Sequence, residues 1–460
     1  MMFEEWIDNN VKNVLLVEPN FPVPNKSRNH SNFLPIGLLK IASYLREKNI
    51  KIQLIRYEEP SNKKNSTQTT FDKSSNKKKE KNELAPDLIC VTSIFTYWSK
   101  YVKNAVQYFK KKYPTTPVLV GGIYASLMPK HCKEYTGCDD VILGTIDPAE
   151  ELIPAYDLVD VDYQILHATR GCIRKCGFCG TYIIEPKWIC KKSIKNEIIK
   201  KKLIFYDNNL LANEYIENIL EELIELKQEH KITYIESQSG FDGRILLKNP
   251  KIATMLKKAG FKNPKIAWDY GVAQNKYIKK QIDILIKAGF KPKEISIFMI
   301  YNYDLNYNEM EEKRVYCANW GVQITDCRYR PLDQTFDEYS PHKTKGQTNK
   351  DYYIHPKWTD SEIRKYRRNI RRHNICMRHE VDYHSTVLER KKIPQELAHK
   401  YREMNYDEVK NHLPDAWTPF KFHDSNEQDY FKFDKNLSTN TKNKTKSKQK
   451  NLSKIKTKNL

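Results

Sequence analysis

The strongest constraint on the fold is a repeated alternation between short β-rich runs and helical patterns. Helical patterns at 35–49 and 97–113 separate the first set of runs, and these patterns predict a parallel sheet with helices on both faces. The runs of this first set are VLLVEP (14–19), KIQLIRY (51–57), DLICVTS (87–93), PVLVGG (117–122) and DDVILG (139–144). Ligands of such sheets bind at the carboxyl ends of the strands, so the loops at 19–31, 93–98 and 121–125 are expected to share one rim.

A second alternation begins at residue 163 and has helical patterns at 212–230 and 277–290. Its runs are YQILHATRG (163–171), KLIFYD (202–207), ITYIESQS (232–239), KIAWDYG (265–271), ISIFMIY (295–301) and VQITDCRY (322–329). Six strand–helix units predict a partial (β/α)6 barrel. The predicted class is therefore α/β, with a doubly wound parallel sheet followed by a partial barrel.

The division of the chain follows from these patterns and from two polar stretches. We expect a first domain over 1–155, a barrel over 156–330, a C-terminal extension over 331–433 and a disordered tail over 434–460. The stretch 61–82 is predicted to be a disordered insertion in the first domain. The net charge is +22, and nine lysines without an acidic residue lie in Lys435–Leu460. The remaining chain is only mildly basic.

The cysteines and the N-terminus indicate a reducing compartment. The first twenty residues are acidic and lack a long apolar core, which argues against a signal peptide. No run approaches the roughly 18 apolar residues of a membrane span. The ten cysteines do not follow the rhythm of a small disulfide-rich domain. We expect a cytoplasmic protein without a membrane partner, whose cysteines are free or bound to metal.

Three cysteines in TRGCIRKCGFCG (169–180) form the most specific motif, C-x3-C-x2-C. Structural zinc usually takes four ligands in two separated pairs, and a disulfide would leave one thiol over. A 4Fe-4S cluster fits better, because Cys172, Cys176 and Cys179 can hold three irons and leave the fourth open for a small molecule. The glycines of the loop allow close wrapping, and its basic residues offset the charge of the cluster.

This motif, with Phe178 before the last cysteine and a predicted strand before it, resembles the radical S-adenosylmethionine enzymes over about 160–330. The resemblance implies that the open iron chelates the amino and carboxylate groups of S-adenosylmethionine. It also implies reductive cleavage to methionine and a 5′-deoxyadenosyl radical, which abstracts a substrate hydrogen. An electron donor such as flavodoxin or ferredoxin is then implied as a partner.

The first domain resembles the flavodoxin-like, cobalamin-binding domain that precedes many such enzymes, through VLLVEPNFPVP, GLLKIASYLREK and VLVGGIYASLMP. Cobalamin proteins with a lower axial histidine carry D-x-H-x-x-G after the first strand. The corresponding loop, EPNFPVPNKSRNHSNF, lacks this motif, and His30 stands without the aspartate and glycine. Histidine-ligated cobalamin is therefore doubtful, whereas a cofactor without a lower ligand and an empty scaffold domain both stay open.

Polar residues at the predicted strand ends are the candidates for cofactor binding. Asp207 and Asn208 could accept from the amino group of S-adenosylmethionine, although a helix cap is an equal alternative. Glu236 and Gln238 follow the third strand, where a buried carboxylate is costly unless it binds something. Asp269 could contact a ribose hydroxyl or simply lie at the surface.

Arg328 and Arg330 share one face of the sixth strand by period two and could hold a carboxylate of cofactor or substrate. A structural ion pair is an equal alternative. Cys317, Cys327 and Cys376 could ligate a second cluster, although irregular spacing favours buried structural cysteines. The sequence predicts no catalytic residue.

The function predicted from the sequence is radical S-adenosylmethionine chemistry, or cobalamin-assisted methyl transfer, on an unknown substrate. An RNA-modifying radical enzyme is an alternative, because the net charge is +22 and the basic run at 364–379 could bind nucleic acid. A non-catalytic iron–sulfur sensor or binding protein is a further alternative.

Overall fold

The computed structural model describes residues 3–7, 10–23, 34–57, 85–343, 345–379, 383–384 and 420–421. The chain forms two compact units, Met1–Arg378 and His379–Leu460. The predicted insertion at 61–82, the predicted tail at 434–460 and His30 lie outside the described residues. In the part that is described, no helix is both long enough and apolar enough to cross a membrane.

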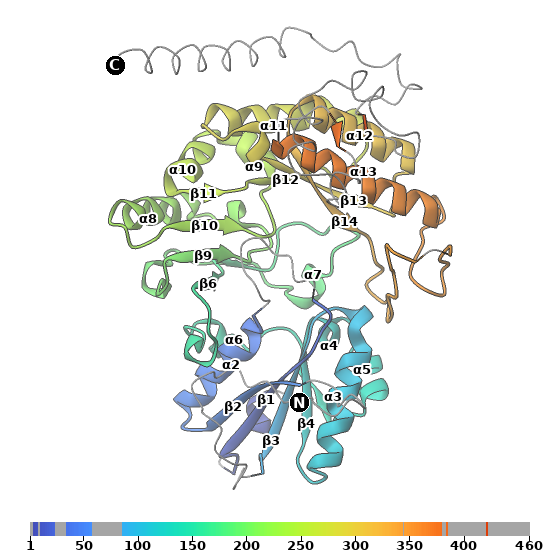
Figure 1. Ribbon diagram of the computed structural model, residues 1–460. Coiled ribbons are helices and arrows are strands. Elements are labelled where there is room, and N and C mark those ends of the chain that lie inside the picture. Colours follow the sequence, from blue (N-terminus) through green and yellow to red (C-terminus); the bar gives the residue numbers. More distant parts are fainter. Residues whose placement is uncertain are drawn as a thin grey trace, which may run out of the picture. The chain divides into compact units, whose positions relative to one another are not determined.

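The first alternation forms a five-stranded parallel sheet in the order β2-β1-β3-β4-β5 (Figure 1). This is the predicted doubly wound arrangement, with the strand order of flavodoxin-like sheets. The strands are β1 (Asn13–Pro19), β2 (Lys51–Tyr57), β3 (Leu88–Ser93), β4 (Val118–Gly122) and β5 (Asp140–Val141). The helices are α1 (Phe3–Trp6), α2 (Ile36–Glu47), α3 (Ser99–Lys112), α4 (Ile123–Leu127), α5 (Pro129–Thr136) and α6 (Asp147–Glu150).

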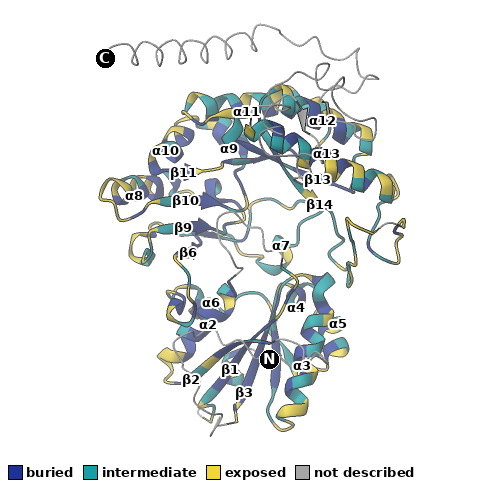
Figure 2. Ribbon diagram, in the orientation of Figure 1, coloured by how far each residue is buried: buried dark blue, intermediate teal, exposed yellow. Residues whose placement is uncertain are grey.

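Burial on both faces explains why these runs are almost continuously apolar. Leu16 belongs to the buried cluster that includes α2 and α6, whereas Leu15 and Val17 belong to the cluster that includes α3 and α5. Because neighbouring residues of a strand point to opposite faces, every position of such a strand must be apolar. Figure 2 shows β1 and β3 buried along their length.

The second alternation forms two parallel sheets, β11-β10-β9-β6 and β12-β13-β14, joined by a bridge between Phe241 and Ile266. Together they give the predicted partial barrel, with a short strand, β11 (Phe261–Lys262), that the sequence did not predict. The other strands are β6 (Tyr163–Leu166), β9 (Lys202–Phe205), β10 (Tyr234–Ser237), β12 (Lys265–Ala267), β13 (Ser296–Tyr301) and β14 (Gln323–Arg328). The helices are α7 (Thr181–Ile184), α8 (Ile216–Gln228), α9 (Gly243–Lys248), α10 (Lys251–Ala259), α11 (Asn275–Lys287) and α12 (Tyr307–Asn319).

The barrel core continues beyond residue 330. Tyr352, Trp358 and Tyr366 are buried in the same cluster as the barrel helices. The helix that carries Tyr366 is α13 (Asp360–His379), which contains the basic run at 364–379. The compact units therefore divide at Arg378, inside the extension predicted over 331–433. In the second unit, β15 (Tyr383–His384) and β16 (Phe420–Lys421) pair antiparallel.

Candidate functional site

The cysteine motif lies on the loop between the first barrel strand and α7. A short pair of antiparallel strands, β7 (Thr169–Arg170) and β8 (Ile189–Cys190), frames this loop. Cys172, Cys176 and Cys179 are half-buried and free. The backbone N–H of Arg174 donates to Cys172 Sγ at 3.4 Å, and the Cys179 thiol donates to Thr181 Oγ1 at 3.2 Å. The three thiols thus sit on one loop at the barrel mouth, as predicted.

The thiols interact electrostatically. Burial raises the pKa of both Cys172 and Cys176, and the charge of Cys179 adds to each shift. Within the described residues, however, no three His, Cys, Asp or Glu side chains converge closely enough to hold a metal ion. This result applies equally to the motif and to Cys317, Cys327 and Cys376, so the second cluster stays a prediction.

The cysteine loop is fastened closely to its neighbours. Gly171 has φ +75°, and a Cβ at this position would lie 2.2 Å from the carbonyl oxygen of Lys187. The Gly171 N–H donates to Glu185 Oε2 at 2.7 Å, and Arg170 Nη2 lies 2.9 Å from Glu185 Oε1. The start of the loop therefore requires glycine, and one carboxylate holds two successive residues before Cys172.

A second carboxylate, Asp242, connects the loop to the start of α9. Arg174 donates to Asp242 Oδ2 through Nε at 3.1 Å and Nη2 at 3.0 Å, while Arg244 Nε donates to Oδ1 at 2.7 Å. Asp242 is also the N-cap of α9, because its side chain accepts from Arg244 N. Sequence reasoning assigned Arg174 only a charge-balancing role and missed Asp242. The available signal was only an aspartate before Gly-Arg, because aspartate is a favoured residue at helix N-caps.

Asp207 and Asn208 lie in different surroundings after β9. Asp207 is fully buried, accepts from the backbone and the hydroxyl of Thr169, and has its pKa raised to about 6 by burial. Asn208 is exposed, and its Oδ1 lies 3.2 Å from Thr181 Oγ1. Of these two, Asn208 has the accessible side chain near the cysteines. Contact of either residue with S-adenosylmethionine stays a prediction.

Glu236 already has a protein partner. Its side chain is 2% exposed, its Oε1 lies 2.6 Å from Lys265 Nζ, and Tyr234 OH donates to its Oε2. From the sequence, a bound ligand was expected to compensate the cost of burying the Glu236 carboxylate. The ion pair with Lys265 provides this compensation within the protein. Gln238 is half-buried, and its backbone N–H donates to Phe205 O at 2.9 Å. Cofactor contacts of both residues remain predictions.

Asp269 lies near the cysteine loop. Burial raises its pKa, and its charge in turn raises the pKa of Cys176. Lys313 holds this strand end, because its Nζ donates to Trp268 O at 2.7 Å and Tyr270 O at 3.1 Å. Burial lowers the pKa of Lys313 to about 8. The sequence analysis did not single out this lysine, whose position on α12 gives no pattern that distinguishes it from a surface residue.

Arg328 and Arg330 converge on one carboxylate of the chain. Arg328 Nη2 lies 2.6 Å from Asp337 Oδ2, and Arg330 Nε lies 2.5 Å from the same oxygen. The Arg330 guanidinium also lies 4.5 Å from the ring centroid of Tyr97 in the first domain. The ion-pair alternative is therefore present in the structure, whereas a role toward an external carboxylate stays a prediction.

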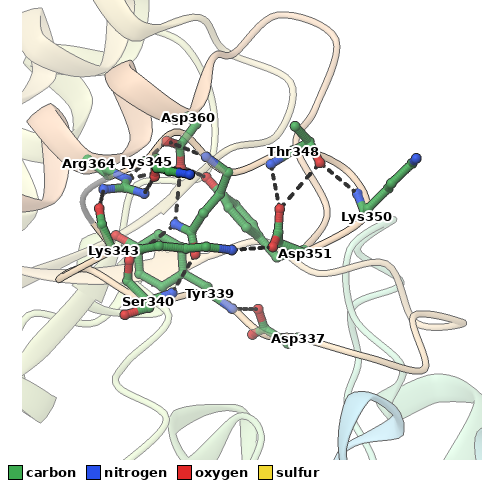
Figure 3. Close-up of polar contacts among 12 residues, drawn as sticks. Asp337, Tyr339, Ser340, Lys343, Lys345, Thr348, Lys350, Asp351, Asp360 and Arg364 are labelled. Carbon is green, nitrogen blue, oxygen red and sulfur yellow. Dashed lines mark hydrogen bonds and ion pairs between the residues drawn. The ribbon is translucent and has the colours of Figure 1, made fainter.

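The segment that carries Asp337 is held by further polar contacts (Figure 3). Arg364 on α13 pairs with Asp360 at 3.0 Å and donates to Lys345 O at 3.2 Å. Asp351 Oδ2 accepts from Thr348 N at 2.9 Å. This segment supplies the partner of both strand-end arginines from beyond the predicted barrel boundary.

The rim of the first domain is glycine-rich and aromatic. Gly122 has φ +98°, and Ser93 Oγ donates to Gly121 O at 2.7 Å and accepts from Ala125 N at 3.1 Å. Phe21 stacks on Trp98 with ring centroids 5.6 Å apart. Flat apolar surfaces thus accompany a closely packed strand-to-helix turn at the predicted rim.

A cavity of about 800 Å³ lies next to this rim. Its lining combines the β5–α6 connection with α7 and the residues that follow it, and includes Val141, Leu143, Arg170, Ile183, Glu185 and Ile189. The cavity is therefore bounded by the first domain and by residues that fasten the cysteine loop. Its size falls within the range of small-molecule and cofactor sites.

Comparison with known protein families identifies the type of the first domain. Residues 30–153 match the family described as B12 binding domain, so the chain carries a domain of the B12-binding type. The match exists although D-x-H-x-x-G is absent. The doubt about cobalamin that the missing motif raised is therefore not supported.

Two solved structures resemble the chain at low identity. One is the radical S-adenosylmethionine methyltransferase TsrM from Kitasatospora setae with cobalamin and a 4Fe-4S cluster bound, with a TM-score of 0.49, 12% identity, and coverage of 71% of this chain and 77% of that chain. The other is the same enzyme with tryptophan substrate and the analogue aza-SAM, with a TM-score of 0.47, 11% identity, and coverage of 70% and 75%. No curated protein matches the chain. No residue role follows from likeness at this level.

Proposed function

We propose that this chain is a radical S-adenosylmethionine enzyme that uses cobalamin for methyl transfer. The observation that carries the proposal is the position of Cys172, Cys176 and Cys179. They lie on a single loop after the first strand of a partial barrel, and a B12-binding domain precedes that barrel in the chain. When bound, a 4Fe-4S cluster with one open iron supplies reductive cleavage of S-adenosylmethionine, and cobalamin supplies a methyl carrier.

The residues of the chain fit a cluster on this loop. Thiolates are the usual protein ligands of iron–sulfur clusters, and hydrogen bonds to sulfur tune them. The Arg174 N–H already donates to Cys172 Sγ, and the Arg174 guanidinium is anchored by Asp242. Gly171 and Glu185 hold the start of the loop from the other side. These contacts fix the loop backbone while the thiols stay accessible for a metal.

Cobalamin would be held without a lower histidine ligand in this proposal. The rim offers an aromatic surface, Phe95 stacked on Tyr97 at 5.0 Å, which suits the flat face of a macrocycle. Phe95 is 37% exposed, so part of this surface is open. The Arg330 guanidinium over Tyr97 connects the rim to the last barrel strand.

The test is anaerobic reconstitution of the full chain with iron, sulfide and hydroxocobalamin. We expect about four irons, a shoulder near ~400 nm, corrinoid bands and reductive formation of 5′-deoxyadenosine. Replacing Cys172, Cys176 and Cys179 together by alanine should remove the iron. Cys190→Ala is the matched control, because Cys190 is also half-buried but lies outside the motif. A folded protein that binds only zinc would contradict the proposal.

The electron donor and nucleic acid remain predicted partners. The helix of the basic run, α13, buries Ile363, Tyr366 and Ile370 against the barrel and exposes Lys365 and Arg368. Such a solvated basic face favours RNA only weakly. The test measures the salt dependence of RNA binding by the full chain and by a chain lacking 435–460. If the affinity for RNA vanishes with the tail, the binding is nonspecific.

A further inference from the structure

A lysine is completely buried between α12 and the barrel sheet. Lys313 lies on α12 and is 0% exposed, although its side chain carries an ammonium group. Its Nζ donates to Trp268 O at 2.7 Å and to Tyr270 O at 3.1 Å. The same nitrogen lies 5.0 Å from the centroid of the Trp268 ring. Two carbonyl oxygens and the face of an indole therefore surround the charge.

Packing alone does not account for a charge at this position. Moving an ammonium group out of water is costly, and burial accordingly lowers the pKa of Lys313. Replacement of a buried charge by an apolar side chain of similar volume is often neutral or stabilising. The lysine is therefore best explained by the groups that it binds.

The two carbonyls belong to the turn after β12, where the sheet stops supplying partners. β12 pairs with β13, and the last backbone bond in this direction runs from Trp268 N–H to Phe298 O at 3.0 Å. Beyond this point the carbonyls of Trp268 and Tyr270 need other donors, since backbone oxygens removed from water are almost always paired. Lys313 donates to both of them from a different element.

Asp269 stands between the two anchored peptide groups. Its side chain is half-buried, and its charge acts on Cys176 of the cysteine loop. Against the effect of burial, the charges of Lys313 and Asp269 favour each other's ionised form. Because one ammonium group holds the backbone before and after Asp269, the direction of the Asp269 carboxylate depends on Lys313.

We propose that Lys313 is a positioning residue that holds Asp269 toward S-adenosylmethionine at the cysteine loop. The inference rests on the proposed function for the ligand, and it adds a residue that does not touch this ligand. Lys313 is buried behind the turn and acts through Asp269. Removal of the lysine therefore changes the affinity of the site while every side chain that faces the ligand is still present.

The test compares Lys313→Met, Asp269→Asn and the double variant in the anaerobically reconstituted full chain. Affinity for S-adenosylmethionine is measured by equilibrium dialysis. We expect each single variant to bind about tenfold more weakly, and the double variant to bind no more weakly than Asp269→Asn alone, because residues that act as a unit are not additive. Lys279→Met is the matched control, since Lys279 pairs with Asp283 at an exposed site on α11 and should leave the affinity unchanged.

Hydrogen exchange tests the positioning without any cofactor. In the full chain before reconstitution, exchange is followed in the peptide 265–275, which contains the bonded amides of Trp268 and Gln274. We expect these amides to exchange at least about tenfold faster in Lys313→Met than in the wild type, while the amides of β9 keep their rates. Lys313→Gln is measured in parallel, because its amide still offers a neutral donor, and it should give a smaller acceleration.

The outcomes separate this inference from the proposed function. Unchanged affinity for S-adenosylmethionine in Lys313→Met, or losses that multiply in the double variant, would overturn the positioning role. Equal acceleration of exchange in the turn and in β9 would also overturn it, because Lys313 would then serve general stability. A wild type that holds its iron but does not bind S-adenosylmethionine contradicts the proposed function, and hydrogen exchange still decides whether Lys313 holds the turn.

Discussion

Asp207 accepts two hydrogen bonds from Thr169, one from the backbone N–H at 2.5 Å and one from the hydroxyl at 2.7 Å. Thr169 opens the strand that leads into Cys172, so a buried carboxylate after β9 fixes the start of the cysteine loop. Asp207 is not the cap of the following helix, because α8 begins at Ile216. Its Oδ2 has no hydrogen-bond partner among the described residues.

The first prediction concerns the pH dependence of stability. Burial raises the pKa of Asp207 from 3.8 to about 6, so the folded state binds this proton more tightly than the unfolded state. The stabilisation is present below about pH 4 and is lost as pH rises through about 6. The shift corresponds to roughly 3 kcal/mol. Relative to wild type, Asp207→Asn should lose this dependence in urea unfolding between pH 4 and 7, and parallel pH profiles would contradict the assignment.

The second prediction concerns the glycine pair at the rim of the first domain. A Cβ at Gly122 would lie 2.1 Å from Ser93 O, and its φ of +98° disfavours any side chain. Gly122→Ala should cost several kcal/mol, at least about 3, and should weaken hydroxocobalamin binding. At Gly121 the nearest atoms lie 3.8 Å away, so Gly121→Ala is the matched control. Equal unfolding midpoints of the two variants would refute the close approach.

The fold was largely predictable, because doubly buried parallel strands are apolar at almost every position. The run 51–57 coincides with β2, and 14–19 lies within β1. The prediction was poorest at the edge of the first sheet. There the predicted strand DDVILG (139–144) is reduced to β5, which contains only Asp140–Val141. Gly144 has φ +64° there and turns the chain out of the sheet. The bridge between Phe241 and Ile266 also has no counterpart in a sequence pattern.

The site was predictable only where its residues lie close together in the sequence. The cysteine spacing lies within one loop and needs no tertiary information. By contrast, Glu236 meets Lys265 from another strand, 29 residues away. Whether a buried carboxylate serves a ligand or an ion pair depends on such a partner, and the sequence does not give the partner's position. The ring contacts of Phe178 with Tyr303, of Tyr303 with Tyr329 and of Tyr329 with Tyr353 likewise join four separate segments.

The third prediction concerns Asp242, which joins Arg174 of the cysteine loop to Arg244. The Asp242 side chain is 6% exposed, whereas the arginines are 36% and 41% exposed, so solvent screens part of the interaction. Asp242→Ala should destabilise the protein by about 1–2 kcal/mol and should speed loss of iron from the reconstituted protein. Asp283→Ala, which removes the exposed pair with Lys279, should cost less than about 0.5 kcal/mol. Equal rates of iron loss in the two variants would argue against Asp242 as an anchor of the loop.

The fourth prediction separates the two interpretations of Arg328 and Arg330. Asp337 is 7% exposed and is shared by both guanidinium groups, so Asp337→Ala leaves two cations near each other without their partner. The expected cost is about 3–5 kcal/mol, measured by urea unfolding, because removal of one member exposes the desolvation penalty of the others. Glu338→Ala is the adjacent control, since its pair with Lys100 is exposed at both ends and should contribute less than about 1 kcal/mol.

A further pair of variants, at Arg330 and Asp337, tests a role of Arg330 in binding the carboxylate of S-adenosylmethionine. If the ion pair with Asp337 is its main role, Arg330→Gln should lower stability and leave the affinity for S-adenosylmethionine unchanged. A double-mutant cycle with Asp337→Asn should then give a coupling energy of about 1 kcal/mol or more, because the two side chains are in direct contact. A large loss of S-adenosylmethionine affinity with little coupling would instead favour the ligand role predicted from the sequence.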